Sequence, residues 1–270
     1  MVRSLASRIL AGAYLLLVGA VLGAAVAAAV PDPVGNASST LVDSSAGLVP
    51  RAPSVPRYRR CKQSGQLALT FDDGPYLGAS TATLLEKYGG RGTYFVNGYN
   101  WGCIYESSHA EDLLRHVDIT TLTTDQLHRQ LDLLETALWK ILGVKPRFFR
   151  PPYGRYDQKS LQVLNDRGYI VVLWDFDDRD TLGDTPAQSI AGYKKLAMTY
   201  PRPHIALNHE TQQSTVDVVI PAVVPLLRQQ GYRLVGMDQC LAQNPYQAVG
   251  TPQARDSTWT CAGKPGPGQP

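Results

Sequence analysis

Apolar and polar residues alternate with two different periods along the middle of the chain. Leu67, Leu69 and Phe71 alternate with smaller residues, a period of two that predicts a strand. From residue 127 to 141, leucine and isoleucine recur at helical spacing. A Thr123-x-x-Gln126 capping box precedes them and Gly143 follows, so a helix is expected between these two signals.

The same reading extends to the rest of the middle region. Further strands are expected at residues 93–96, 148–149, 169–174, 204–208 and 232–235. Further helices are expected before Gly168, from Thr185-Pro186 onward, and over 216–230, the last kinked or interrupted by Pro221 and Pro225. Alternating strands and helices imply parallel strands with helical crossovers, hence an α/β fold. Chemistry in such folds gathers at the carboxyl ends of the strands.

Both ends of the chain differ from this middle region. Arg3 and Arg8 precede an uncharged apolar run over residues 9–30 that ends in Ala27-Ala28-Ala29, the pattern of a secretory signal. The run is long, so an uncleaved signal-anchor is the alternative. We expect a signal peptide at 1–30, a disordered linker at 31–60, a folded α/β domain at 61–243 and a Pro/Gly-rich tail at 244–270.

Composition narrows the class of protein. The 270 residues are 44% hydrophobic and 18% charged, an ordinary globular balance, and a net charge of +3 without basic blocks argues against a nucleic-acid partner. The four cysteines form no C-x-x-C pair, so disulfides are expected, and the sequence leaves all three pairings open. Asn36 begins a glycosylation sequon. We expect a secreted, monomeric protein, associated with a membrane only if the apolar segment stays attached.

Charged residues stand where the predicted strands end. Asp72 and Asp73 follow the first strand directly. Adjacent carboxylates repel each other, and a cation can hold one ionised while the other acts as a base. Arg150-Pro151-Pro152-Tyr153-Gly154, the acidic run 174–180 and Leu207-Asn208-His209-Glu210 follow three further strands. Each cluster alone is compatible with a solvated turn, but four in succession predict an active site.

These motifs resemble those of the NodB-homology polysaccharide deacetylases, or carbohydrate esterase family 4. Thr-Phe-Asp-Asp-Gly-Pro, Arg-Pro-Pro-Tyr-Gly, Trp-Asp-Phe-Asp-Asp-Arg-Asp and Leu-Asn-His occur in the family's order over about residues 61–243. The flanking residues are most similar to fungal chitin deacetylase-like proteins. The resemblance implies an incomplete, distorted (β/α) barrel. It also implies removal of N-acetyl groups from N-acetylglucosamine polymers such as chitin.

The resemblance also implies a role for individual residues. Asp72 would be the general base, oriented by Arg150, and His209 the general acid, tuned by Asp180. A divalent metal, zinc in the usual case, would be bound by Asp73 and His116. Four residues would bind the substrate: Tyr153, Pro151, Trp174 and Leu207. The backbone N–H of Tyr153 would help hold the oxyanion, and Leu207 would line the pocket for the acetyl methyl.

The second family motif, H-[S/T]-x-x-H, is incomplete in this chain. His116 matches its second histidine, but Asp112 stands four residues earlier, and the stretch after Cys103 is short by about a dozen residues, the span of a βα connection. Three explanations stay open: a shortened gene model or splice product, a carbohydrate-binding pseudoenzyme, or a rebuilt site that uses Asp112. A cell-wall structural protein, anchored by its N-terminal segment, is a further alternative.

The resemblance also leads to an expectation for the disulfides. Cys61 and Cys240 flank the barrel ends where its first and last elements meet, so we expect them to pair. Cys103 would then pair with Cys261 and tie down the tail.

Overall fold

The computed structural model describes residues 55–99, 103–106, 117–265 and 269. The chain divides into two units, residues 1–52 and 53–270, and every described residue belongs to the second. The expected signal segment, Asn36, Asp112 and His116 lie outside the described residues. Over the described ranges, no helix combines the length and the apolar character needed to cross a membrane.

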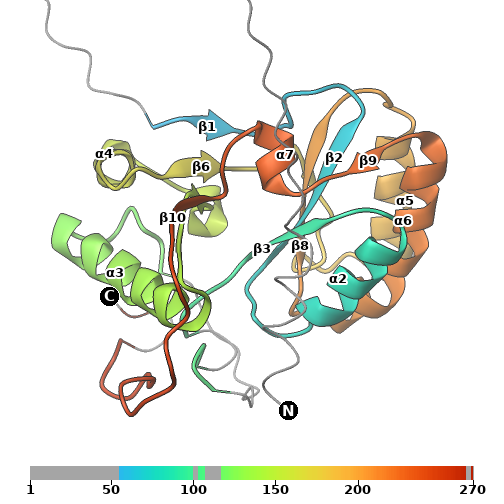
Figure 1. Cartoon of the computed structure of the whole chain (residues 1–270). Helices are drawn as coiled ribbons and strands as arrows, with labels where there is room; N and C mark the ends of the chain where they lie inside the picture. The colour runs from blue at the N-terminus through green and yellow to red at the C-terminus, as the bar shows by residue number, and fades with distance from the viewer. Residues whose placement is uncertain (1–54, 100–102, 107–116, 266–268, 270) are drawn as a thin grey trace, which may run out of the picture. The chain divides into compact units, whose positions relative to one another are not determined.

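Strands and helices alternate along most of the second unit (Figure 1). The strands are β1 (Arg57–Tyr58), β2 (Gln66–Asp72), β3 (Gly92–Phe95), β4 (Val144–Pro146), β5 (Phe148–Phe149), β6 (Ile170–Val172), β7 (Phe176–Asp177), β8 (His204–His209), β9 (Arg233–Leu234) and β10 (Tyr246–Val249). The helices are α2 (Gly78–Lys87), α3 (Thr124–Leu142), α4 (Gln158–Asp166), α5 (Pro186–Ala197), α6 (Ile220–Gln230) and α7 (Met237–Leu241), with a short 3-10 helix at Pro152–Gly154 and a short π-helix at Thr215–Val219.

Parallel strands form two sheets that continue into each other. One sheet has the order β3-β2-β8-β7, with β9 also paired to β2, and the other has the order β1-β6-β5. The Asp175 N–H, which follows β6, donates to the Ile205 carbonyl in β8 at 3.2 Å and joins the two. Strands β4 and β10 form a separate antiparallel pair. The arrangement agrees with the α/β fold that the sequence predicts and with the incomplete, distorted (β/α) barrel that the resemblance implies.

The alternation in β2 and β8 separates the packed core from the site. Leu67, Leu69 and Phe71 are fully buried in one hydrophobic cluster with residues of α2, α5 and α6, the helices at the right of Figure 1. Because side chains alternate across a strand, Thr70 and Asp72 project from the opposite face. A second cluster packs α3 and α4 against β6. The pattern that buries β2 therefore also aims its polar residues into the barrel.

Local signals place several helices where the sequence predicts them. Helix α3 begins at a capping box formed by Thr123 and Gln126 and ends at Gly143, which adopts a left-handed conformation. Helix α5 begins after Thr185 in the same way, with Pro186 in its first turn. The expected helix over 216–230 is interrupted at its start, where the π-helix precedes α6, and Pro225 lies inside α6.

The structure differs from the expected boundaries of the domain. The linker expected to reach residue 60 already contains β1, which pairs with β6, and Val55 is only 2% exposed. The tail expected from 244 contains β10, which pairs with β4. Both strands are short and pair with distant segments, so tertiary contacts rather than local alternation decide them.

Two disulfides fasten these terminal segments, and both pairings are as expected. Cys61 is bonded to Cys240, and Cys103 to Cys261. The second links the loop after β3 to the tail beyond β10. The tail is also held by the Lys140 ammonium, which donates to the Thr258 hydroxyl at 2.6 Å.

Candidate active site

An ion pair occupies the end of β2. The Arg150 guanidinium donates from Nη1 to Asp72 Oδ1 and to the Thr70 hydroxyl, both at 2.7 Å. It also lies 4.3 Å from the centre of the Phe95 ring. The Arg150 side chain is 2% exposed and that of Asp72 16%, so the pair is largely shielded from water. This arrangement fixes the orientation of the Asp72 carboxylate.

A histidine–carboxylate pair occupies the end of the neighbouring strand β8. His209 Nδ1 lies 2.7 Å from Asp180 Oδ1, and the His209 backbone N–H donates to Asp180 Oδ2 at 2.8 Å. The Thr215 hydroxyl donates to the same oxygen at 2.9 Å. Three hydrogen bonds therefore hold Asp180 behind the imidazole, and Nε2 is the ring nitrogen left for chemistry in the cavity.

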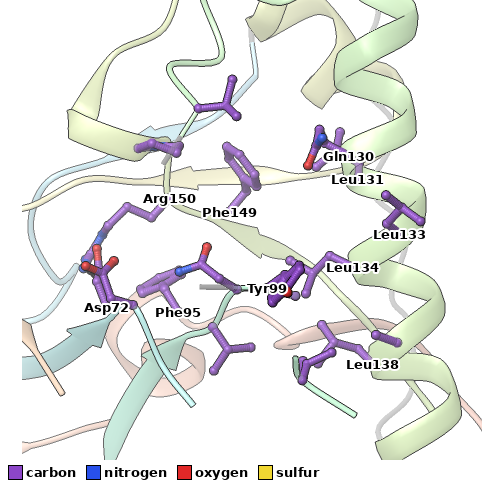
Figure 2. A pocket seen from close by; sticks show the side chains of 18 of the residues that line it. Asp72, Phe95, Tyr99, Gln130, Leu131, Leu133, Leu134, Leu138, Phe149 and Arg150 are labelled. Atoms are coloured by element: carbon purple, nitrogen blue, oxygen red, sulfur yellow. Dashed lines mark hydrogen bonds and ion pairs between the residues drawn. The ribbon is translucent and has the colours of Figure 1, made fainter. Parts of the chain in front are cut away.

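The two pairs face one cavity of about 980 Å³. Figure 2 shows Asp72 and Arg150 on one side of it and Leu134 and Leu138 of α3 on the other. Eight of the ten residues predicted for the site line this cavity: Asp72, Asp73, Arg150, Pro151, Tyr153, Trp174, Leu207 and His209. Asp180 lies behind His209, and His116 is outside the described residues.

The protonation states follow from burial and neighbouring charges. Burial raises the pKa of Asp72, the adjacent Asp73 carboxylate adds to the rise, and Arg150 and His209 oppose it. Burial acts to lower the pKa of His209, but Asp180, helped by Asp73 and Asp72, raises it to about 9. The imidazole is therefore protonated at neutral pH, as a general acid must be, and it faces the same cavity as Asp72.

The described residues supply one expected metal ligand, Asp73. Among them, no group of three His, Cys, Asp or Glu side chains is placed to bind a metal ion. The surroundings of Asp73 nevertheless suit a cation, because Asp72, Asp73 and Asp177 all line the cavity. The repulsion between Asp72 and Asp73 that raises the pKa of Asp72 would be relieved by a positive charge there.

Two buried polar residues at the site were not assigned a role from the sequence. Thr70 accepts from Arg150 and donates to the Ala206 carbonyl at 2.6 Å. Glu210, directly after His209, is 2% exposed, and burial raises its pKa to about 7. The sequence does contain a signal for Thr70: it stands two positions before Asp72 in a predicted strand, so the two side chains project from the same face. The sequence contains no comparable signal for Glu210.

Comparisons with known proteins agree with this geometry. Residues 59–172 match the family model for polysaccharide deacetylases. A chitin deacetylase of Pestalotiopsis sp is 30% identical over 194 residues, which are 67% of this chain and 65% of that protein. The chain thus spans slightly less than two thirds of the length of this relative.

Two solved structures show how widely the fold is shared. The structure of the chitin deacetylase from Colletotrichum lindemuthianum aligns with a TM-score of 0.66 and 28% identity, covering 74% of this chain and 98% of that one. A family 4 pseudoenzyme from Bacillus anthracis aligns with a TM-score of 0.54, covering 70% of this chain and 69% of that one. At 17% identity it shares the fold alone. The chain therefore belongs to the polysaccharide deacetylase family, the NodB homologues of carbohydrate esterase family 4.

Proposed function

We propose that this protein hydrolyses the N-acetyl groups of N-acetylglucosamine polymers, with chitin as the first substrate to test. The observation that carries the proposal is the pairing of Asp72, bound to Arg150, with His209, bound to Asp180, at one cavity wall. A buried carboxylate beside a protonated imidazole provides a base and an acid for amide hydrolysis.

The chemistry requires two proton transfers at the cavity. Asp72 takes a proton from the attacking water, while Arg150 keeps its carboxylate oriented. His209 donates a proton to the leaving nitrogen, and Asp180 stabilises the imidazolium before that transfer. The amide C–N bond breaks as the new C–O bond becomes part of acetate, and the glucosamine amine is released.

Other cavity residues would bind the acetamide group. Leu207, two residues before His209 on the same face of β8, lines the cavity and would contact the acetyl methyl. The backbone N–H of Tyr153 would stabilise the oxyanion, while Pro151 and Trp174 would form the wall around the sugar. Tyr153 has φ +58°, an uncommon conformation for a residue with a side chain, and such residues cluster at functional sites.

The family is in general metal-dependent, and Asp73 with His116 would hold the ion in this chain. A bound divalent metal would polarise the acetamide carbonyl and favour the ionisation of water beside it. The two adjacent carboxylates would then have different roles: Asp73 would bind the metal, and Asp72 would accept the proton from water.

Two further observations support a proposal for the compartment and the substrate. Two disulfides are stable in an oxidising compartment, and the relative from Pestalotiopsis is a chitin deacetylase. We therefore place the protein outside the cell, in contact with a glycan that carries N-acetylglucosamine, and assign it no nucleic-acid partner.

The test is acetate release from chitin oligomers by the purified chain, with added zinc and after chelation. Slow, zinc-dependent release that is lost in Asp72→Asn would support the proposal. Binding of the oligomers without release, even with excess zinc, would instead identify a carbohydrate-binding pseudoenzyme. The incomplete second motif, with Asp112 in place of a histidine, is the observation that favours this alternative.

A further inference from the structure

Glu210 is a buried acidic residue that the proposed chemistry does not use. It follows His209 at the end of β8 and is 2% exposed. Its carboxylate accepts hydrogen bonds from the backbone N–H groups of Tyr76 and Gly78, on the segment that follows Asp72 and Asp73. Its own backbone N–H donates to the Asp72 carbonyl at 3.2 Å. Glu210 thus contacts the Asp72–Gly78 turn at both of its ends.

Two glycines leave the space that this carboxylate fills. A Cβ atom built on Gly74 would lie 1.2 Å from Glu210 Oε1, and one built on Gly78 would lie 2.0 Å from Oε2. Neither glycine has a positive φ, so backbone freedom does not explain them. At both positions a side chain would compete with the Glu210 carboxylate for the same space, and at Gly78 it would also meet the Tyr94 ring at 2.9 Å.

The Glu210 carboxylate also acts as an N-terminal cap for helix α2, which has no side-chain cap of its own. Helix α2 begins at Gly78, and Leu77 before it provides no side-chain hydrogen bond. The first N–H groups of a helix need acceptors from outside the helix, and a carboxylate there also interacts favourably with the helix dipole. Glu210 supplies such an acceptor from the position directly after β8, more than 100 residues away along the chain.

The opposite side of the same turn is fixed to β3. The Asp73 N–H donates to the Phe95 carbonyl at 3.2 Å, and the Asn97 N–H donates to the Gly74 carbonyl at 2.8 Å. Asp73 itself has φ +76°. The direction of the Asp73 carboxylate therefore depends on a turn that is held between β3 and Glu210.

We propose that Glu210 is a positioning residue: its carboxylate caps α2 and locks the Asp72–Gly78 turn to the strand that carries His209. The base, the expected metal ligand Asp73 and the acid are thereby kept in one geometry. The effect on catalysis rests on the proposed deacetylase function, whereas the locking of the turn does not.

The first experiment measures amide hydrogen exchange in Glu210→Gln. The amide group of Gln retains the shape but replaces one acceptor with a donor that faces a backbone N–H. We expect exchange in the peptide that covers residues 73–80 to accelerate on the order of tenfold, as for the loss of a buried acceptor. Glu86→Gln, an exposed substitution on the same helix, is the control and should change nothing. Unchanged exchange in Glu210→Gln would overturn the proposal.

A second experiment tests the close approach of Gly74 and the Glu210 carboxylate, and it does not require an active enzyme. Gly74→Ala should lower the melting temperature strongly in the wild-type background. In Glu210→Ala most of that penalty should disappear, because the shortened side chain leaves room for the new methyl group. An equal penalty in both backgrounds would contradict the assigned contact.

The functional consequence is tested by kinetics and calorimetry. Glu210→Gln should lower kcat for acetate release about tenfold or more with little change in KM, because the turn carries the base and not the sugar-binding wall. Zinc affinity should fall in parallel. If Glu210→Gln accelerates exchange and leaves kcat and zinc affinity unchanged, the positioning role is wrong. If the wild-type chain releases no acetate, the proposed deacetylase function fails, and the exchange and melting data still decide the role of Glu210.

Discussion

Asp72 and His209 are register partners on the neighbouring parallel strands β2 and β8. Partners in adjacent strands lie about 4.8 Å apart at the backbone and project from the same face of the sheet. Arg150 binds the first and Asp180 the second, so each residue carries its own counter-charge. The spacing of an acid and a base is thus set by strand pairing, a rigid feature of the fold.

The first prediction concerns these two residues. Asp72→Asn and His209→Ala should each lower the rate of acetate release by about 10²–10⁴-fold, because each removes a proton transfer. Binding of chitin oligomers, measured by calorimetry, should remain close to that of the wild type. Asp125→Asn, on the exposed first turn of α3, is the matched control. Turnover near the wild-type rate in either site variant would show that its role is misassigned.

The site could be predicted from the sequence largely because strand ends can be recognised. Asp72, Arg150 and His209 each follow a short apolar segment, and parallel strands bring such positions to one edge. Glu210 could not be assigned in this way, because its role depends on a contact with the turn after β2. Such a contact leaves no local pattern in the sequence.

The helices and strands show the same difference between local signals, which can be read from the sequence, and tertiary contacts, which cannot. Helix α3 has a capping box and a terminal glycine within its own sequence, and it was predicted nearly to the residue. Helix α2 was not predicted, since it begins with glycine and has no side-chain cap of its own. Strands β1 and β10 have two and four residues, too few for alternation to be read, and they form because partners lie beside them.

The second prediction concerns Thr70, whose hydroxyl links Arg150 to β8. Thr70→Val keeps the shape but leaves a buried Arg150 N–H without its acceptor, which costs about 1–3 kcal/mol. Urea unfolding should show this loss of stability, and acetate release should fall because Arg150 no longer orients Asp72 firmly. Thr83→Val, at an exposed position in α2, should change neither property. Unaltered stability in Thr70→Val would mean that Arg150 finds another acceptor.

The third prediction is a dependence of stability on pH. The pKa of His209 is raised from 6.5 to about 9 in the folded state. A raised pKa contributes stability that is complete below 6.5 and is lost as pH rises through about 9. Asp178 and Glu210 also have raised pKa values, of about 7. They lose most of their protons at a lower pH than His209 does, so their contribution to the pH dependence of stability is largely complete before His209 titrates.

Thermal melts between about pH 7.5 and 9.5 therefore report mainly on His209. We expect the wild-type melting temperature to fall across this interval. In Asp180→Asn, the fall should be much smaller, because the carboxylate that stabilises the imidazolium is gone. Asp125→Asn should retain the wild-type slope. Parallel curves for the wild type and Asp180→Asn would exclude His209 as the group responsible.

The last prediction addresses the incomplete metal motif. A catalytic zinc takes three protein ligands and keeps one position open, whereas Asp73 and His116 are two. We therefore expect the chain as written to bind zinc weakly and to release acetate slowly or not at all. Asp112 stands four residues before His116, the spacing that places two side chains on one helix face.

Asp112→His should then raise zinc affinity on the order of 10- to 100-fold. Even the residues that hydrogen-bond to metal ligands change metal affinity by that much when they are mutated. Acetate release should rise with it, and an insertion of family length before Val117 that restores the full motif should raise both further. Glu111→His adds the same imidazole five residues before His116, outside the spacing of the motif. It should change neither zinc affinity nor acetate release. Tight zinc binding and full activity in the unmodified chain would show that Asp112 or another residue already replaces the missing histidine. No gain from either restored variant, in a chain that still binds chitin oligomers, would support the pseudoenzyme, because the loss would then extend beyond one ligand.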